Sequence, residues 1–427
     1  MKFTKIFASL MVLGLAAPVA FADAPATASA STQSQLDSMR AQLNKMEAII
    51  NQNNAGGFQQ AADWTSRITI SGLVNVDAYA SNTSPNFGLK SGTAMGGHSS
   101  NLSVNNANLF VDALVNDWTN VHMGLAYNSN RSKAYSREPA SPIFDEGYVT
   151  IANFSETPFF FRAGTEYLPY GFYDRYPMVQ NPTQLLSETR ATAAQVGFVS
   201  PVGVYGSVYG FRGMSETTDP VNRPRINNWG ANLGYAFSNA MYGLKLDAGY
   251  LNNMADVNYI GHHLASQSGT YSDRVGGLAL HAGGSMGPFD AKADWVTALQ
   301  RFNAANVGYN GKGAKPSAWG AEIGYTFPVL AHQSRVGVGY QQSYQSSSKN
   351  TYTAPLAGID GVAVTSNNSL GAYGLPKNRY YGTYTVNVSK WTDIGLEVYH
   401  DRDFSLGQGG TGTSATVGVL QLGVKFA

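Results

Sequence analysis

The chain has no cysteine, few charged residues and, beyond its N-terminus, no long apolar run. The lack of cysteine excludes disulfides, thiolate metal sites and a cysteine nucleophile. Charged residues make up 13% of the 427 residues, against about a quarter in a typical soluble domain. No segment after the N-terminus approaches the ~18 consecutive apolar residues of a membrane-spanning helix. A mature chain that enters a membrane must therefore do so with β-strands.

Clear catalytic and metal-binding patterns are also scarce. The seven histidines are scattered, and His262-His263 lacks the i, i+4 spacing of a helical metal site. The formal net charge of +1 gives no reason to expect a nucleic-acid partner. We therefore expect a protein that is not an enzyme and that uses no metal ion or cofactor.

The N-terminus has the features of a secretory signal peptide. Lys2 and Lys5 precede an apolar run over residues 6–20, and Ala20-Phe21-Ala22 forms an A-x-A cleavage site. An uncleaved membrane anchor is disfavoured because this run is short for a spanning helix. We expect residues 1–22 to be removed during export, which changes the net charge from +1 to −1.

Residues 23–57 are expected to form a linker and a short coiled coil on the periplasmic side. Ala, Thr and Ser dominate the first part, which is typical of a flexible linker. Apolar residues then recur at spacings of three and four, the pattern of a coiled-coil seam. These residues are Leu36, Met39, Leu43, Met46 and Ile50. About two heptads make a marginal helix, so the segment either self-associates, for example in a homotrimer, or remains an amphipathic linker.

Residues 58–427 are predicted to form an all-β fold, a 16-stranded antiparallel transmembrane β-barrel. In ITISGLVNVDAY, Ile70, Val74 and Val76 share one face, and polar residues occupy most of the other. This alternation, together with 47 Gly, 25 Tyr and 20 Phe, is typical of a membrane barrel with aromatic girdles. The predicted strands start near residues 67, 102, 119, 144, 158, 193, 203, 227, 242, 274, 287, 317, 334, 378, 392 and 414.

The connections between these strands alternate between short turns and long polar loops. Short turns of bacterial barrels face the periplasm and long loops face the outside, so both chain ends are expected on the periplasmic side. A soluble β-sandwich is the alternative for such alternation. It is disfavoured because aromatic residues such as Trp229 and Phe237 flank aliphatic ones along a strand, as in a lipid-facing belt. We therefore expect an outer-membrane protein in contact with lipid.

The polar strand faces are expected to line a lumen that contains charges of both signs. Seven acids against six bases predict no strong ion preference, and most should brace the wall as ion pairs. The predicted inward charges are Asp77, Arg162, Glu166, Lys245, Asp247, Asp290, Lys292, Asp294, Glu322, Arg335, Arg379, Glu397 and Lys425.

The third long loop, residues 167–192, is the candidate for narrowing this lumen. It combines charged residues with several Tyr and Phe, a set that suits binding of a polar ligand. The alternative is a surface loop whose aromatic residues pack on the barrel rim. The candidate constriction and ligand-binding residues are Arg175, Arg190, Asp174, Glu188, Tyr170, Tyr173, Arg162 and Glu166.

Several segments resemble the LbtU-type siderophore porins of the outer membrane. They are the coil at Leu36 to Ile50 ahead of ITISGLVNVDAY, then FDEGYVTIANF, FFFRAGTEYLPYGFYD and SETRATAAQVGF up to Val199. The resemblance implies a barrel that takes up an iron-siderophore without a large plug domain. About 44 residues between Ala22 and the first strand agree with that, since they are too few for a plug.

Uptake of an iron-siderophore is thus the leading functional hypothesis. A porin for general small solutes is the runner-up, and composition does not separate the two. A surface receptor or adhesin that binds through long loops, above all residues 345–377, is a third possibility. An outer-membrane enzyme is disfavoured because no catalytic constellation is evident.

Overall fold

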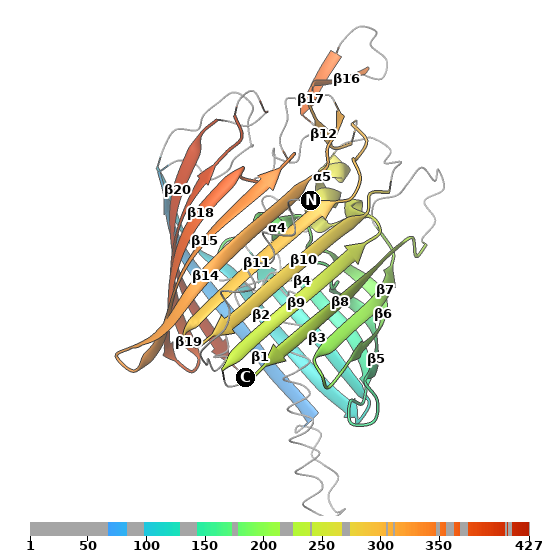
Figure 1. The fold of residues 1–427 in the computed structure, drawn as a ribbon, viewed down its shortest axis with the longest axis vertical. Coiled ribbons are helices and arrows are strands. Elements are labelled where there is room, and N and C mark those ends of the chain that lie inside the picture. Colours follow the sequence, from blue (N-terminus) through green and yellow to red (C-terminus); the bar gives the residue numbers. More distant parts are fainter. Residues whose placement is uncertain are drawn as a thin grey trace, which may run out of the picture.

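The chain forms a closed antiparallel barrel of sixteen strands (Figure 1). This architecture is seen in a computed structural model that describes residues 67–82, 98–128, 143–172, 178–213, 225–239, 241–266, 274–304, 306–310, 312–346, 351–355, 363–367, 375–405, 408 and 412–426. The barrel strands are β1 Ile68–Ser81, β2 Ser99–Asn116, β3 Thr119–Asn128, β4 Ile143–Ala152, β5 Phe159–Tyr167, β6 Arg190–Val199, β7 Val204–Phe211, β8 Asn228–Ser238, β9 Tyr242–Leu251, β10 Gly277–Met286, β11 Phe289–Ala298, β14 Ser317–Val329, β15 His332–Tyr344, β18 Asn378–Ser389, β19 Thr392–Arg402 and β20 Ser414–Phe426.

Smaller elements lie in the long connections. Two hairpins extend from them, β12 Gly308–Tyr309 with β13 Lys312–Gly313, and β16 Thr351–Pro355 with β17 Ala363–Asn367. The helices are α4 Pro182–Leu185, the 3-10 turn η2 Met254–Asp256 and α5 Asn258–Ser266. Within the described residues, no helix has the length and apolar character needed to span a membrane.

The strand prediction is confirmed. Every predicted start lies within three residues of a barrel strand, and consecutive barrel strands pair with each other. β1 also pairs with β20, which closes the barrel. At this seam Gly72 lies opposite Phe426, and a Cβ on Gly72 would be 2.6 Å from the phenyl ring. The predicted signal peptide, the linker and the coiled coil lie outside the described residues.

Three of the short turns are stabilised by an asparagine side chain at their start. Asn116, Asn153 and Asn239 each precede a tight turn, and the side-chain oxygen of each accepts backbone N–H donors two or three residues ahead. Such Asx turns reverse the chain within a few residues. The short turns gather at one end of the barrel and the long connections at the other (Figure 1). By the rule for bacterial barrels, the short-turn end is periplasmic.

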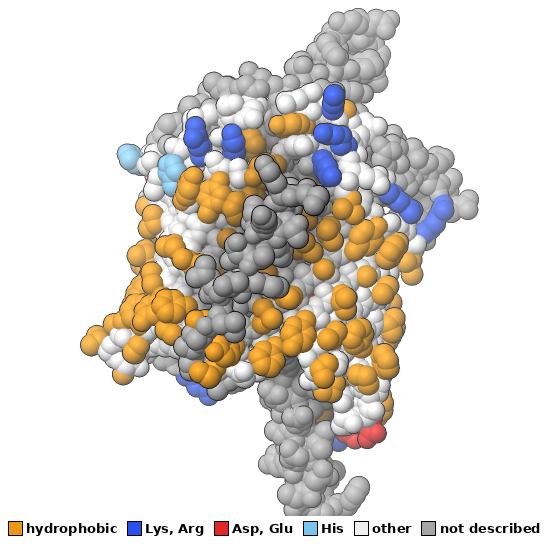
Figure 2. All heavy atoms as spheres, in the orientation of Figure 1, with side chains coloured by type: hydrophobic (Ala, Val, Ile, Leu, Met, Phe, Trp, Pro, Cys, Tyr) orange, Lys and Arg blue, Asp and Glu red, His pale blue; other side chains and the backbone are white. Residues whose placement is uncertain are grey.

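The outer surface of the barrel is apolar. Leu233, Ile323 and Leu420 are more than half exposed at mid-barrel positions, and a belt of hydrophobic side chains covers the visible face (Figure 2). Aromatic rings flank the belt, with Phe289 and Tyr325 at the periplasmic edge and their centroids 4.9 Å apart. Exposed apolar area of this extent is stable in lipid rather than in water.

Candidate functional site: a loop across the barrel lumen

The loop between β5 and β6 enters the barrel and reaches its far side. Its helix α4 contacts β11, β14 and β15, which stand across the ring of strands from β5 and β6. Ahead of α4, the backbone N–H of Met178 donates to the carboxylate of Glu397 on β19. Arg379 on β18 donates to the carbonyl of Gln180 over 2.9 Å. The loop predicted to narrow the lumen therefore spans it.

The first arm of the loop runs along β9 and β10. The Phe172 ring stacks on His281 with centroids 4.5 Å apart, and the Lys245 ammonium lies 4.3 Å from the centre of the same ring. Glycines permit this close approach, because a Cβ on Gly249 would be 3.3 Å from the Pro169 carbonyl oxygen. At Gly277 it would be 2.1 Å from the Tyr170 hydroxyl. A side chain at Gly277 would displace Tyr170, and one at Gly249 would crowd the backbone of the loop.

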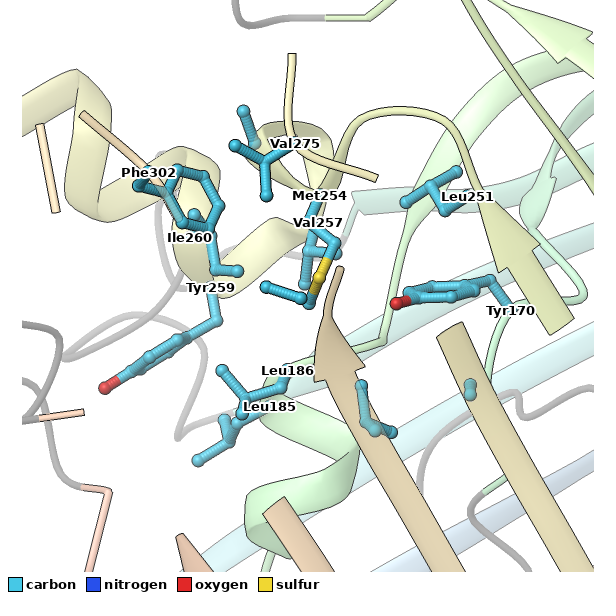
Figure 3. Close-up of a cluster of buried hydrophobic side chains, with 14 of the residues drawn as sticks. Tyr170, Leu185, Leu186, Leu251, Met254, Val257, Tyr259, Ile260, Val275 and Phe302 are labelled. Carbon is cyan, nitrogen blue, oxygen red and sulfur yellow. The ribbon is translucent and has the colours of Figure 1, made fainter. Parts of the chain in front are cut away.

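The loop packs into an apolar core inside the extracellular half of the barrel (Figure 3). Tyr170 and Leu186 have exposures of 0%, and they pack in one cluster with Met254, Ile260 and Phe302 from the later loops. Apolar residues of the inner wall complete the cluster; they include Ala193, Tyr209, Phe211, Ala279, Val296 and Ala318. One side of the barrel mouth is therefore filled by side chains, and Tyr170 faces this core instead of a solute.

A second contact holds the far arm of the loop. Met178 is buried in a cluster with Tyr381, Tyr399, Val417 and Val419 on β18, β19 and β20. The loop is thus fixed at both ends of its path, by hydrogen bonds and by apolar packing.

The remaining predicted loop residues have different placements. Glu188 is buried and accepts a hydrogen bond of 2.7 Å from the Gln184 amide within the same loop. Arg190 donates to the carbonyls of Phe144 and Asp145 over 2.6 and 2.5 Å, and its side chain is 20% exposed. Arg190 is therefore held against β4. Tyr173, Asp174 and Arg175 lie outside the described residues.

Arg162 and Glu166 form a buried pair in the barrel wall. Their charged atoms are 3.2 Å apart and their side chains are 2% and 0% exposed. The guanidinium also donates to the Thr150 hydroxyl and lies 4.4 Å from the centre of the Tyr148 ring. This geometry supports the bracing interpretation for the pair.

Two further guanidinium groups brace the opposite wall. Arg335 on β15 donates to Asp290 on β11 and to Glu322 on β14, over 2.6 and 2.7 Å. Arg379 forms a two-point contact with Asp401 at 2.6 and 2.7 Å. Bidentate pairs of this kind are strong and directional. They tie neighbouring strands together behind the loop.

Several acids of the inner wall were not predicted from the sequence. Asp112 and Glu146 face His122, whose ring nitrogens are 2.8 and 3.9 Å from their carboxylates. Asp401 faces Arg379, and Asp393 is 3.3 Å from the Lys425 ammonium. Strand parity was the available signal for Asp401, because it lies four residues after the inward Glu397 on the same strand. With these four acids added to the seven predicted ones, acids outnumber Lys and Arg on the described inner wall by a wider margin than the sequence indicated.

Two observations bear on possible metal and catalytic sites. The described residues contain no group of three or more His, Asp or Glu placed to hold a metal ion. The segment from Gly283 to Gly287 matches the G-x-S-x-G pattern of serine hydrolases. It forms the end of β10 and the tight turn into β11, whereas the hydrolase motif needs a turn from a strand into a helix.

Comparison with known sequences gives relatives of modest similarity. No protein-family model matches the chain. A UPF0422 protein of Coxiella burnetii is 27% identical over 327 residues, which cover 76% of this chain and 64% of that protein. A UPF0422 protein of Legionella pneumophila is 28% identical over 358 residues, which cover 76% of this chain and 62% of that protein. The chain thus spans slightly less than two thirds of the length of these relatives.

Solved structures share the fold. The outer membrane channel DcaP of Acinetobacter baumannii has a TM-score of 0.51 at 13% identity, over 87% of this chain and 100% of that one. The anion-selective porin from Comamonas acidovorans has a TM-score of 0.51 at 11% identity, over 84% and 99%. OprB of Pseudomonas putida has 0.52 at 11% identity, over 84% and 94%. The chain is a porin-like β-barrel. These matches show the barrel fold, and they do not show membership of the siderophore family.

Proposed function

We propose that this protein is a porin-type channel for small polar solutes rather than an enzyme. The observation that carries the proposal is the loop between β5 and β6, which crosses the lumen and is anchored on β18 and β19. A barrel of sixteen strands encloses a channel wide enough for solutes, and an inserted loop reduces its cross-section. Residues that face the remaining space then select among solutes by size and charge.

The finer proposal is that the solute is an iron-siderophore. It is supported by the resemblance of the Phe144 to Val199 region to siderophore porins and by the aromatic and charged character of the loop. The proposal assigns the attraction of an anionic complex to Arg175 and Arg190. The excess of wall acids favours the alternative, a general porin with a preference for neutral or cationic solutes.

Growth of a deletion strain tests both proposals. Under iron limitation with a supplied ferric siderophore, a defect that appears only in iron-poor medium supports siderophore uptake. An equal defect on several unrelated small nutrients supports the general porin.

Conductance in planar bilayers tests the channel itself. The purified protein is expected to form open channels, and a ferric siderophore should reduce their current if it binds in the lumen. Replacement of Arg175 and Arg190 by Ala should weaken that block while channels still form. A barrel that folds but never conducts ions contradicts the porin proposal, whereas conduction without block contradicts only the siderophore proposal.

A further inference from the structure

Three basic residues lie near one another at the extracellular edge of the barrel, between β11 and β14. They are Arg301, Lys312 and Lys315, here called the basic edge cluster. The Gln345 side-chain oxygen accepts from the Arg301 guanidinium over 3.1 Å and from the Lys315 backbone N–H over 2.9 Å. Arg301 also donates to the carbonyl of Gly313, the residue after Lys312, over 2.9 Å. These contacts bring the Arg301 guanidinium next to the backbone of the segment that carries Lys312 and Lys315.

The described residues provide no acidic partner for this cluster. None of its three cations forms an ion pair with a described residue, and Arg301 and Lys312 are exposed. Figure 2 shows Lys and Arg side chains gathered at the extracellular end of this face, while acidic side chains appear only at the opposite end. Like charges held together without compensation repel each other and favour a bound anion.

The cluster stands at the height of lipid headgroups. Directly below it, the Trp319 indole donates to the Tyr344 hydroxyl over 3.3 Å. The Trp319 ring also contacts Tyr340, which contacts Tyr380, with centroids 5.4 and 4.9 Å apart. Such an aromatic belt marks the boundary between hydrocarbon and headgroups. Lys315 lies two residues before Ser317 and four before Trp319, so it shares their outward parity.

We propose that the basic edge cluster binds the phosphate groups of the outer-leaflet glycolipid, lipopolysaccharide. Phosphates carry the charge that the cluster lacks, and a guanidinium matches their geometry with paired donors. Acyl chains of the same molecule would lie on the apolar belt below, beside Trp319 and Tyr344. The cluster is therefore a lipid site on the outside of the barrel, separate from the lumen.

Binding of lipopolysaccharide to the purified full chain in detergent tests this proposal. Replacement of Arg301, Lys312 and Lys315 by Gln should lower the affinity by roughly 100-fold, because each cation near an anionic lipid surface contributes about a factor of five. Lys390→Gln is the matched control, since Lys390 is an exposed cation at the periplasmic end, and it should bind like wild type. Dephosphorylated lipopolysaccharide and phosphatidylglycerol should bind wild type more weakly than intact lipopolysaccharide.

Heat-modifiable mobility in gels shows that each variant is folded. If the triple variant does not fold, Lys312→Gln alone, in the exposed hairpin β12–β13, should show a smaller loss in the same direction. Equal affinity of the folded variant and wild type would overturn the proposal. Equal binding of dephosphorylated lipopolysaccharide would also overturn it. Equal binding of phosphatidylglycerol would overturn the preference for the glycolipid and indicate a site for anionic lipids in general.

Discussion

Glycine residues make room for the side chains that brace the inner wall. A Cβ on Gly324 would lie 2.1 Å from the Arg335 guanidinium, which is held by Asp290 and Glu322. On β15, a Cβ on Gly339 would be 2.2 Å from the Tyr381 ring, whose hydroxyl donates to Glu322 over 2.8 Å. At these two positions glycine leaves the space that the Arg335 and Tyr381 side chains occupy.

Gly324→Ala is expected to destabilise the barrel by about 1 to 3 kcal/mol, the usual range for overpacking. The new methyl group would displace a guanidinium that three hydrogen bonds hold in place. Gly418→Ala is the control, because nothing lies within 4 Å of a Cβ at that position. Urea unfolding in detergent micelles measures both variants. Equal midpoints for the two would mean that Arg335 moves aside without loss.

Charge should be tolerated differently on the two faces of β20. Leu422 is 44% exposed toward lipid and pairs with Ile394 near the periplasmic start of β19, so Leu422→Arg is expected to cost about 1 to 2 kcal/mol, less than at the bilayer midplane. Gln421 faces the lumen and donates to Asp77 over 2.8 Å, so Gln421→Arg should be nearly neutral. Refolding yield into lipid vesicles compares them; equal losses would contradict the assigned faces.

On the same lipid-facing surface, an Arg at Tyr235 should cost less stability than the sequence alone suggests. It pairs with Val204, the first residue of β7, and therefore lies near the periplasmic edge. We expect Tyr235→Arg to cost no more than about 1 kcal/mol, as for charges close to the membrane interface.

At the scale of elements, the loop between β5 and β6 is the segment that crosses the lumen. It contacts β9 and β10 with its first arm and β18 and β19 with its second. Its apolar residues join those of residues 251–264 and Phe302 in one core. The three segments therefore stabilise one another, and the loop has the rigid support that a selective constriction needs.

Shortening this loop by removal of residues 174–188 should raise the single-channel conductance. The deleted segment includes α4 and the contacts with Glu397 and Arg379, which hold the chain across the lumen. Removal of residues 356–362, between β16 and β17, is the control, because that hairpin extends away from the barrel end (Figure 1). Unchanged conductance after the first deletion would place the ion path away from the loop.

At the scale of the whole molecule, the barrel presents one apolar surface to lipid. The association of several copies of the chain is a separate prediction. The predicted seam at residues 36–50 lies outside the described residues, so its role in a homotrimer stays a prediction. A short seam gains stability mainly by association with other copies.

Leu43→Asp is expected to reduce crosslinked oligomers of the membrane-embedded protein. An acid in the apolar seam is costly to bury, whereas the barrel itself would be unaffected. Chemical crosslinking in intact outer membranes gives the measurement, with heat-modifiable mobility as the control for folding. If oligomers persist at wild-type level, contacts between barrel walls hold the copies together.

The sequence by itself determined the barrel. Strand alternation has a period of two residues and is set locally by the pleat, so sixteen strands and their short turns were predictable without knowledge of distant contacts. Turn residues such as Asn116 and Asn239 act within three residues of chain. The same locality explains why outward residues such as Leu422 were correctly assigned.

The tertiary structure decided what the barrel contains. Met178 and Glu397 are 219 residues apart in sequence, and no local pattern indicates that they meet. A register shift between Gly124 and Leu125 places Asp145 in a bulge next to Glu146, and both are buried, which a strict period of two does not predict. Tyr170 was a candidate ligand contact because it is an aromatic residue of the loop. It packs in the apolar core instead, among residues that three separate loops contribute. Local periodicity therefore fixed the wall, whereas long-range packing fixed the path of the loop and the charge of the lumen.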